Sequence, residues 1–218
     1  MSSTVLYMSM SLDGFIAGPN ETLDNGLGDG GERLHEWVFS GDTGLALDET
    51  GPVLDAEDRS ADHPEAAVGG HLRVNRQIVN EFMSTGAVIA GRATFEPAGG
   101  WRGDHHDGVP IYILSRHAAP AWVADWPAVH YVSDLEVAVR DAKRAAGEKN
   151  VLVHGAGIAQ RALGAGLLDE LEIHLVPVLF GDGRRLFEHL GVGQRELERV
   201  RVLEGDGGVT HLRYRVCR

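Results

Sequence analysis

The stretch 154–187, HGAGIAQRALGAGLLDELEIHLVPVLFGDGRRLF, contains the pattern that decides the fold. It directly follows the apolar run 151–153, so the glycines at its start end a buried strand, and a helix over 158–163 begins after them. A second strand over 171–178 follows, in which apolar and polar side chains roughly alternate. A strand, a glycine turn, a helix and another strand in this order indicate an α/β sheet whose strands are connected by helices.

The spacing of apolar residues in the rest of the chain predicts the other strands and helices. Further strands are predicted over 4–11, 87–90, 110–115, 129–132, 195–203 and 208–216, the last two joined by a Gly-Asp-Gly-Gly turn. Helices are predicted over 32–39 and 73–84, and a third begins at a capping box formed by Ser133 and Glu136 and ends at Gly147. The prediction is a mixed α/β sheet of about eight strands with flanking helices and a C-terminal antiparallel hairpin.

Composition and length favour one globular unit. The 218 residues are 43% apolar, which predicts a single domain over 1–218, with the polar, weakly periodic segment 19–72 as an insertion or lid. No apolar run approaches the roughly 20 residues of a membrane helix, and the N-terminus lacks the pattern of a signal peptide. The single cysteine, Cys217, cannot form an internal disulfide, so we expect a cytoplasmic protein.

The charge balance limits the classes of partner. A net charge of −12 disfavours nucleic-acid binding, because an acidic surface repels phosphate backbones. An anionic cofactor would need local basic groups and helix N-termini to hold it. We therefore expect a small-molecule partner, with no nucleic acid and no membrane.

The first candidate for such a phosphate site follows the strand 87–90. Gly91 allows a sharp turn, and Arg92 and Thr94 provide a cation and a hydroxyl beside free backbone N–H groups. Ligands of open α/β sheets collect at the carboxyl ends of the strands, where these residues stand. The alternative is an ordinary turn from strand to helix with a solvated arginine.

Two more strand ends carry similar signals. Ser115 and Arg116 end a buried strand and suit the 2′-phosphate that distinguishes NADP from NAD, although a polar strand end without a ligand would read the same way. The small residues Gly155, Ala156 and Gly157 allow a diphosphate or a flat ring to approach the start of a helix. Gln160 stands where a dinucleotide fingerprint would have its third glycine, so a Rossmann fold is not indicated.

Proton donors for a reductive step are sought at the same strand ends. Asp13 and His154 are the candidates, and His154 has the ordinary pKa better suited to work near neutrality. Asp13 could equally be part of a simple Asp-Gly turn. Trp37 and Trp101 could close over a flat substrate or could simply pack in the core.

The other histidines receive structural interpretations. His105 and His106 beside Asp107 look like metal ligands, but a flexible loop presents such side chains poorly, so we expect no metal site. His174 and His211 lie in predicted strands and are expected to be partly exposed.

Taken in order, SLDGFIAG (11–18), AGRATFE (90–96), PIYILSR (110–116) and the stretch 154–187 resemble the dihydrofolate reductase-like superfamily. The chain is most similar to the reductase (C-terminal) domain of the bifunctional riboflavin-biosynthesis deaminase-reductase and to its stand-alone relatives. The resemblance covers 4–18 and roughly 73–218, and it implies an NADPH-dependent oxidoreductase similar to 5-amino-6-(5-phosphoribosylamino)uracil reductase. It also implies a homodimer, with FGDGRRLF (180–187) as a contact loop.

The resemblance further implies the residues that hold NADPH. They are, in chain order, Ile16, Ala17, Gly91, Arg92, Thr94, Ser115, Arg116, Gly155, Ala156, Gly157 and Ile158. By position, the first two would lie near the nicotinamide, the next three at the cofactor phosphates, Ser115 and Arg116 at the 2′-phosphate, and the last four along the diphosphate and nicotinamide. The glycine turn at 155–157 is also where a cis peptide bond is expected in the superfamily.

Two departures from the family pattern lie on the substrate side. Riboflavin-pathway reductases usually have a glutamate before the glycines, where this chain has His154, and an Asp-Asp-Pro-like segment where this chain has GWRGDHHDG (100–108). The substrate is therefore expected to be a small heterocyclic, carbonyl or imine compound, with the riboflavin intermediate as one case. A dihydrofolate reductase and a non-catalytic NADPH-binding module are the alternatives.

Overall fold

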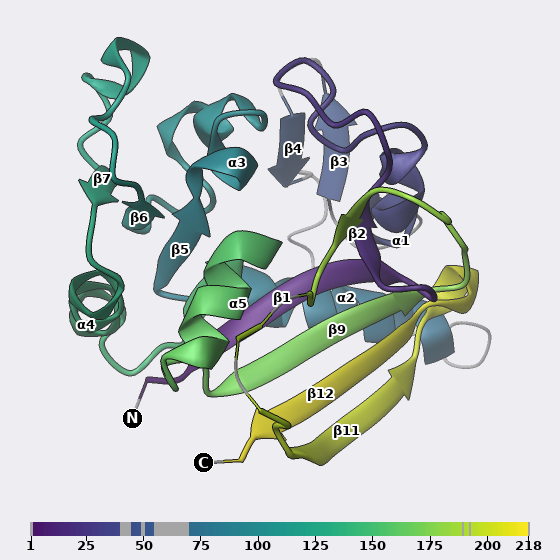
Figure 1. Ribbon diagram of the computed structural model, residues 1–218. Helices are drawn as coiled ribbons and strands as arrows, with labels where there is room; N and C mark the ends of the chain where they lie inside the picture. Colours follow the sequence, from purple (N-terminus) through teal and green to yellow (C-terminus); the bar gives the residue numbers. More distant parts are fainter. Residues whose placement is uncertain are drawn as a thin grey trace, which may run out of the picture.

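The structure is a computed structural model. It describes residues 2–39, 45–48, 51–54, 70–188, 190–191 and 193–217. An eight-stranded sheet runs through it in the order β11-β12-β9-β1-β8-β5-β6-β7 (Figure 1). Its strands are β1 (Thr4–Ser11), β5 (Ala87–Gly91), β6 (Ile111–Leu114), β7 (Val129–Val132), β8 (Val151–His154), β9 (Glu170–Val176), β11 (Leu197–Glu204) and β12 (Thr210–Val216). The predicted mixed sheet is confirmed.

Direction of the strands explains where a ligand could bind. Strands β9, β1, β8, β5, β6 and β7 run parallel to one another, whereas β12 pairs antiparallel with β9 and forms the predicted antiparallel hairpin with β11. The register pairs Ala90 with His154 and Gly91 with Leu114. The carboxyl ends of β8, β5 and β6 therefore lie side by side at one edge of the sheet.

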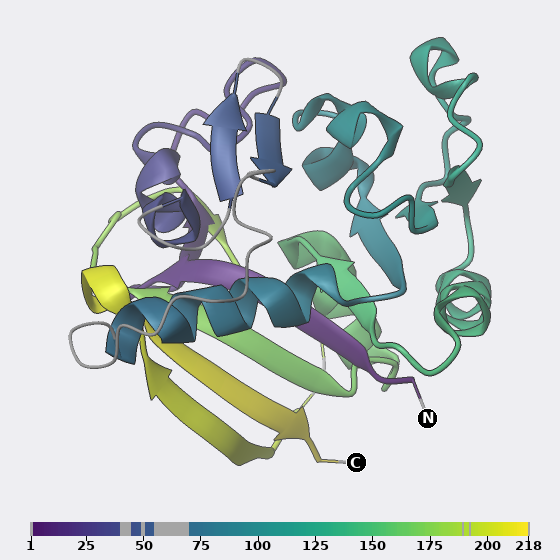
Figure 2. The same cartoon turned by 180° about the vertical axis from the view of Figure 1, so that it is seen from behind.

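Helices cover both faces of the sheet. Helices α4 (Leu135–Ala146) and α5 (Ala156–Gly164) pack on one face, where Val139 and Ile158 join a buried cluster with Ile89 and Val153. Helix α2 (Gly70–Met83) crosses the opposite face, as the view from behind shows (Figure 2). Burial on both faces accounts for the continuous apolar runs of the central strands.

The start of α4 differs from the prediction by one residue. Asp134, not Ser133, is the N-cap, and its side chain accepts a hydrogen bond from the backbone N–H of Val137 at 2.9 Å. The carboxylate therefore has the capping role that the sequence assigned to the serine hydroxyl. The predicted end at Gly147 is confirmed, with φ 62°.

The remaining elements are short. They are β2 (Phe15–Ala17), the 3-10 turn Gly31–Leu34, α1 (Glu36–Phe39), β3 (Leu45–Asp48), β4 (Gly51–Leu54), α3 (Arg92–Phe95), the 3-10 turns Gly99–Gly103, Ala121–Val123 and Asp206–Gly208, and β10 (Arg184–Arg185). Strand β2 pairs antiparallel with β10. The antiparallel β3–β4 hairpin was not predicted, and the rest of the predicted lid, at 40–44, 49–50 and 55–69, lies outside the described residues.

Candidate functional site

Gly155 brings two of the predicted phosphate-binding segments into contact. It is the N-cap of α5, with φ 99° and ψ 152°, a backbone conformation that favours glycine. A Cβ atom at this position would overlap the Thr94 hydroxyl. The turn after β8 and the turn after β5 therefore pack against each other, and the N-terminal end of α5 faces the same edge of the sheet.

Arg92 is already paired within its own turn. Its Nε and Nη2 atoms donate to the two carboxylate oxygens of Glu96 at 2.7 and 2.9 Å. This pairing raises the pKa of the Arg92 guanidinium and lowers the pKa of Glu96. A phosphate bound at this turn would have to share the guanidinium with Glu96.

At the end of β6, the two predicted residues have different surroundings. Ser115 is buried, and its hydroxyl donates to the carbonyl of His117 at 2.8 Å and accepts from the backbone N–H of His117 at 3.0 Å. Arg116 is exposed. The serine thus shapes the turn, and the arginine is the cation that this strand end offers to a ligand.

Ile16 and Ala17 lie in β2 and are buried. Ile16 belongs to the same apolar cluster as Ala156 and Ile158 of α5. Three of the residues predicted to flank a nicotinamide therefore contribute to one apolar cluster, although they are far apart in the sequence. The peptide bonds of the glycine turn at 155–157 are trans, so this chain lacks the cis bond that the superfamily has at this turn.

Asp13 connects two loops. Its carboxylate accepts hydrogen bonds from the Ser11 hydroxyl at 2.6 Å and from the backbone N–H groups of Phe180 and Gly181 at 3.1 and 2.7 Å. These hydrogen bonds, that from Ser11 foremost, lower the pKa of Asp13 to about 2. A carboxylate held ionised in this way argues against Asp13 as a proton donor near neutrality.

His154 ends β8 among other aromatic rings. Its ring centroid lies 6.0 Å from that of Trp101 and 6.0 Å from that of His105. Burial lowers the pKa of His154 to about 4, and its Nδ1 atom is buried without a hydrogen-bond partner. The prediction of His154 as a proton donor relied on the ordinary histidine pKa, whereas desolvation in this position disfavours the imidazolium.

The two tryptophans differ in their surroundings. Trp37 is buried, and its indole N–H donates to the Ser9 hydroxyl at 2.9 Å. Its ring packs 4.5 Å from that of His174, so Trp37 has the packing role. Trp101 is partly buried and stands edge-on to His105, at 4.6 Å.

Two histidines, in β9 and β12, were not predicted as site residues. His174 and His211 are only 5% and 0% exposed, so the expectation of partial exposure is wrong: α2 and α1 cover the sheet face on which they lie. Glu172 and His174 stand two residues apart in β9 and therefore lie on the same face of the strand. From the sequence alone, a face with polar side chains at this spacing is expected to be exposed to solvent. The missing information was that a helix covers this face.

Among the described residues, no three His, Cys, Asp or Glu side chains are arranged to hold a metal ion. No helix in the same part of the chain combines the length and the apolar character needed to cross a bilayer.

Comparison with known proteins identifies one matching family. The sequence model of the RibD C-terminal domain matches residues 3–211. No curated protein matches the chain.

Solved structures share the fold at low identity. A protein from Shewanella sp. PV-4, named as a riboflavin biosynthesis protein, has 20% identity and a TM-score of 0.63, with 99% of each chain covered. Acinetobacter baumannii RibD has 17% identity and a TM-score of 0.58, and the match covers 100% of this chain and 58% of that one. The Thermotoga maritima diaminohydroxyphosphoribosylaminopyrimidine deaminase/5-amino-6-(5-phosphoribosylamino)uracil reductase has 15% identity and a TM-score of 0.56, with 99% and 57% covered. The chain thus spans under two thirds of the length of these last two proteins.

Proposed function

The chain belongs to the RibD C-terminal domain family, and from this premise we propose that it is an NADPH-dependent reductase of a small heterocyclic, carbonyl or imine substrate. The observation that carries the proposal is the meeting of the carboxyl ends of β5, β6 and β8 at one edge of the sheet. Parallel α/β sheets bind ligands at this edge, and each of the three ends carries residues suited to a phosphorylated dinucleotide.

The proposed cofactor site runs across these three ends. Residues at the first turn, Gly91, Arg92 and Thr94, would hold the phosphates together with the N-terminal end of α5. Contact between Gly155 and Thr94 supports this arrangement, because the two turns proposed for the phosphates pack against each other there. Arg116, exposed beside Ser115, would hold the 2′-phosphate.

The nicotinamide would lie near the start of α5. Ile16 and Ala17 on one side, and the segment 155–158 on the other, would hold the ring and exclude water, since Ile16 and Ile158 share one buried cluster. NADPH would supply the hydride, and this chain would supply position and orientation.

On the substrate side, His154 is the proposed catalytic residue. It immediately precedes the turn proposed for the nicotinamide, and its ring stands beside Trp101. With a pKa of about 4, the ring is neutral near pH 7, so it would orient the substrate by hydrogen bonding rather than act as a cationic acid. Asp13 is proposed as a loop anchor. Reduction of 5-amino-6-(5-phosphoribosylamino)uracil is the specific activity that the family suggests.

The proposal is tested by titrating the protein with NADPH and with NADH. Wild type should prefer NADPH, and Arg116→Ala should weaken NADPH binding about tenfold while leaving NADH binding unchanged, because a charge-assisted bond to the 2′-phosphate is lost. Arg144→Ala, which removes an exposed cation on α4, is the matched control and should change neither affinity. Equal affinity of wild type for the two cofactors would overturn the assignment of Ser115 and Arg116.

A further inference from the structure

Strand β1 continues past the end of its neighbour β8. The last residue pair between the two strands is Leu6 with Val153, whereas β1 extends to Ser11. Met8 therefore lies beyond this last pair, beside the turn at which α5 begins. There the backbone N–H of Gly155 donates a buried hydrogen bond to the Sδ atom of Met8, 3.3 Å away. Two segments that are 147 residues apart in the sequence thus meet at the turn proposed for the cofactor.

This hydrogen bond and one other fix the conformation of Gly155. The N–H of Gly155 belongs to the peptide plane before its Cα atom, and its carbonyl belongs to the plane after it. Met8 binds the N–H, and the N–H of Ala159 donates to the carbonyl at 3.1 Å. Because both planes are held, the φ of 99° and the ψ of 152° at Gly155 are determined from both sides. The direction in which α5 leaves the turn follows from these two angles.

The N–H groups at the start of α5 depend on this direction. In an α-helix each N–H bonds to the carbonyl four residues earlier, so those of Ala156, Gly157 and Ile158 have no acceptor within the helix. They carry the partial positive charge of the helix N-terminus. Whether they face a cofactor diphosphate is therefore decided by the conformation of Gly155.

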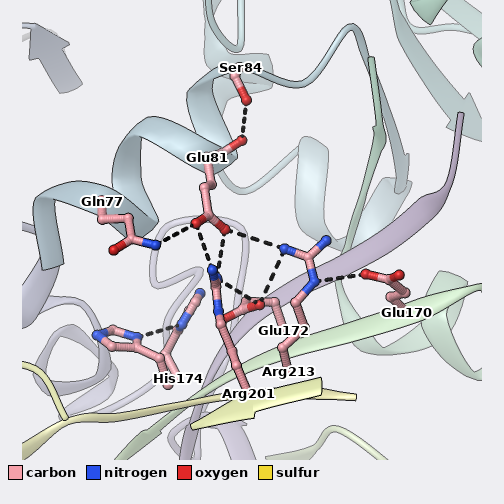
Figure 3. Close-up of polar contacts among 9 residues, drawn as sticks. Gln77, Glu81, Ser84, Glu170, Glu172, His174, Arg201 and Arg213 are labelled. Atoms are coloured by element: carbon pink, nitrogen blue, oxygen red, sulfur yellow. Dashed lines mark hydrogen bonds and ion pairs between the residues drawn. The ribbon is translucent and has the colours of Figure 1, made fainter. Parts of the chain in front are cut away.

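A sulfur acceptor suits the surroundings of Met8. Its side chain belongs to the buried apolar cluster that includes Ile16 and Ile158. A network of ion pairs lies on the opposite face of the sheet, under α2, where Arg201 contacts Glu81 (Figure 3). A carboxylate or an amide in place of the thioether would be buried among apolar groups, which is unfavourable. The thioether packs with these groups and still accepts a hydrogen bond.

We propose that Met8 is a positioning residue of the proposed cofactor site: its Sδ atom holds the N–H of Gly155 and thereby orients the N–H groups at the start of α5 toward the diphosphate of NADPH. Met8 acts through Gly155 and does not itself touch the cofactor. Without the sulfur atom, the buried N–H would lack an acceptor, and the turn would shift to regain one. The inference rests on the proposed function, because it concerns the same site.

NADPH titration of three variants of β1 tests this role. Met8→Leu keeps the apolar character and nearly the volume but has no acceptor, so NADPH should bind about tenfold more weakly. Met8→Gln has an unbranched side chain whose carbonyl oxygen can accept from Gly155, so its affinity should stay within about threefold of wild type. Met10→Leu is the matched control, because Met10 lies on the same face of β1 and packs against the same cluster. It should leave the affinity unchanged.

The order of the two Met8 variants separates positioning from packing. If Met8 only filled space, leucine would replace it better than glutamine, because a buried amide is unfavourable in an apolar cluster. Positioning predicts the reverse order for NADPH affinity, even though Met8→Gln should unfold at the lower urea concentration. Tighter binding by Met8→Leu than by Met8→Gln, or wild-type affinity in Met8→Leu, would overturn the proposal.

NMR of the free wild-type protein gives a measurement that does not depend on how the variants fold. With selenomethionine enriched in selenium-77 at the methionines, we expect a coupling between the selenium of residue 8 and the amide proton of Gly155. The same proton should exchange slowly with solvent. Absence of this coupling would remove the hydrogen bond on which the inference depends.

Failure of this inference is distinguishable from failure of the proposed function. A wild type that does not bind NADPH would overturn the proposed function, and the positioning role with it. A wild type that binds NADPH, together with an unchanged affinity in Met8→Leu, would overturn the role of Met8 alone.

Discussion

Gly155 links the fold to the proposed cofactor site at the scale of one residue. Its φ of 99° and its contact with Thr94 both exclude a Cβ atom, whereas a Cβ at Gly157, two residues on, would meet nothing within 4 Å. The backbone conformation and packing of this turn thus require a glycine at 155 but not at 157.

Substitution of these glycines separates stability from binding. Gly155→Ala should lower the free energy of unfolding by about 2 kcal/mol or more and abolish NADPH binding, because the turn must move. Gly157→Ala should leave stability unchanged or raise it by up to about 1 kcal/mol, as expected for alanine in a helix. Urea unfolding and NADPH titration measure both effects. Equal stability of the two variants would show that the turn tolerates a side chain at Gly155.

The positions of single residues were predictable where they follow from the order of strands and turns. Their protonation states were not predictable, because these depend on burial. The three strand ends at Gly91, Ser115 and His154 are adjacent, as the order of apolar strands and glycines indicated. The low pKa of His154 was not predictable, because burial is its main cause and segments distant in the sequence, such as the one that carries His105, surround the ring.

Helix α4 shows the limit of sequence reading at the scale of an element. Ser133 and Glu136 have the spacing of a capping box, yet Asp134 caps the helix. Ser133 and Asp134 are neighbouring residues that can both cap a helix. Which of them does so depends on the residue at which the helix begins.

The two candidates for this cap can be compared directly. Asp134→Ala should lower the free energy of unfolding by about 1 kcal/mol, because the N–H of Val137 loses its acceptor. Ser133→Ala should change it by less than about 0.5 kcal/mol. Thermal or urea unfolding measures both, and the reverse order would restore the serine as the cap.

Among larger elements, the strands of the main sheet were predicted well, and β7 matches its predicted range residue for residue. The β3–β4 hairpin was missed, because its segment lacks the alternation that marks a strand. The covered face of β9 was misread for the opposite reason: a clear alternation was present, but the polar side faces α2 and not solvent.

At the scale of the whole molecule, the hairpin β11–β12 leaves an apolar surface open. Leu197 and Val202 in β11 are 40% and 44% exposed, and they pair with Val216 and Leu212 in β12. An exposed apolar patch on an edge strand favours association with another chain. We propose that this surface forms a homodimer, in addition to or in place of the loop 180–187.

Light scattering of the purified protein tests the dimer. Wild type should have the mass of two chains, and Val202→Glu should shift it toward one, because a carboxylate would be buried in the interface. Leu23→Glu, at an exposed residue far from β11 in the sequence, is the control and should remain dimeric. A monomeric wild type would refute the dimer, and a dimeric Val202→Glu would move the interface elsewhere.

We propose that one edge of the sheet, formed by the carboxyl ends of β5, β6 and β8, binds a phosphorylated dinucleotide although the chain has a net charge of −12. A crystal structure of the protein with NADP⁺ tests it most directly. We predict density for the cofactor across the turns at Gly91 and Gly155, with its 2′-phosphate at the Arg116 guanidinium. Cofactor bound at any other surface, or none bound at saturating concentration, would contradict the account.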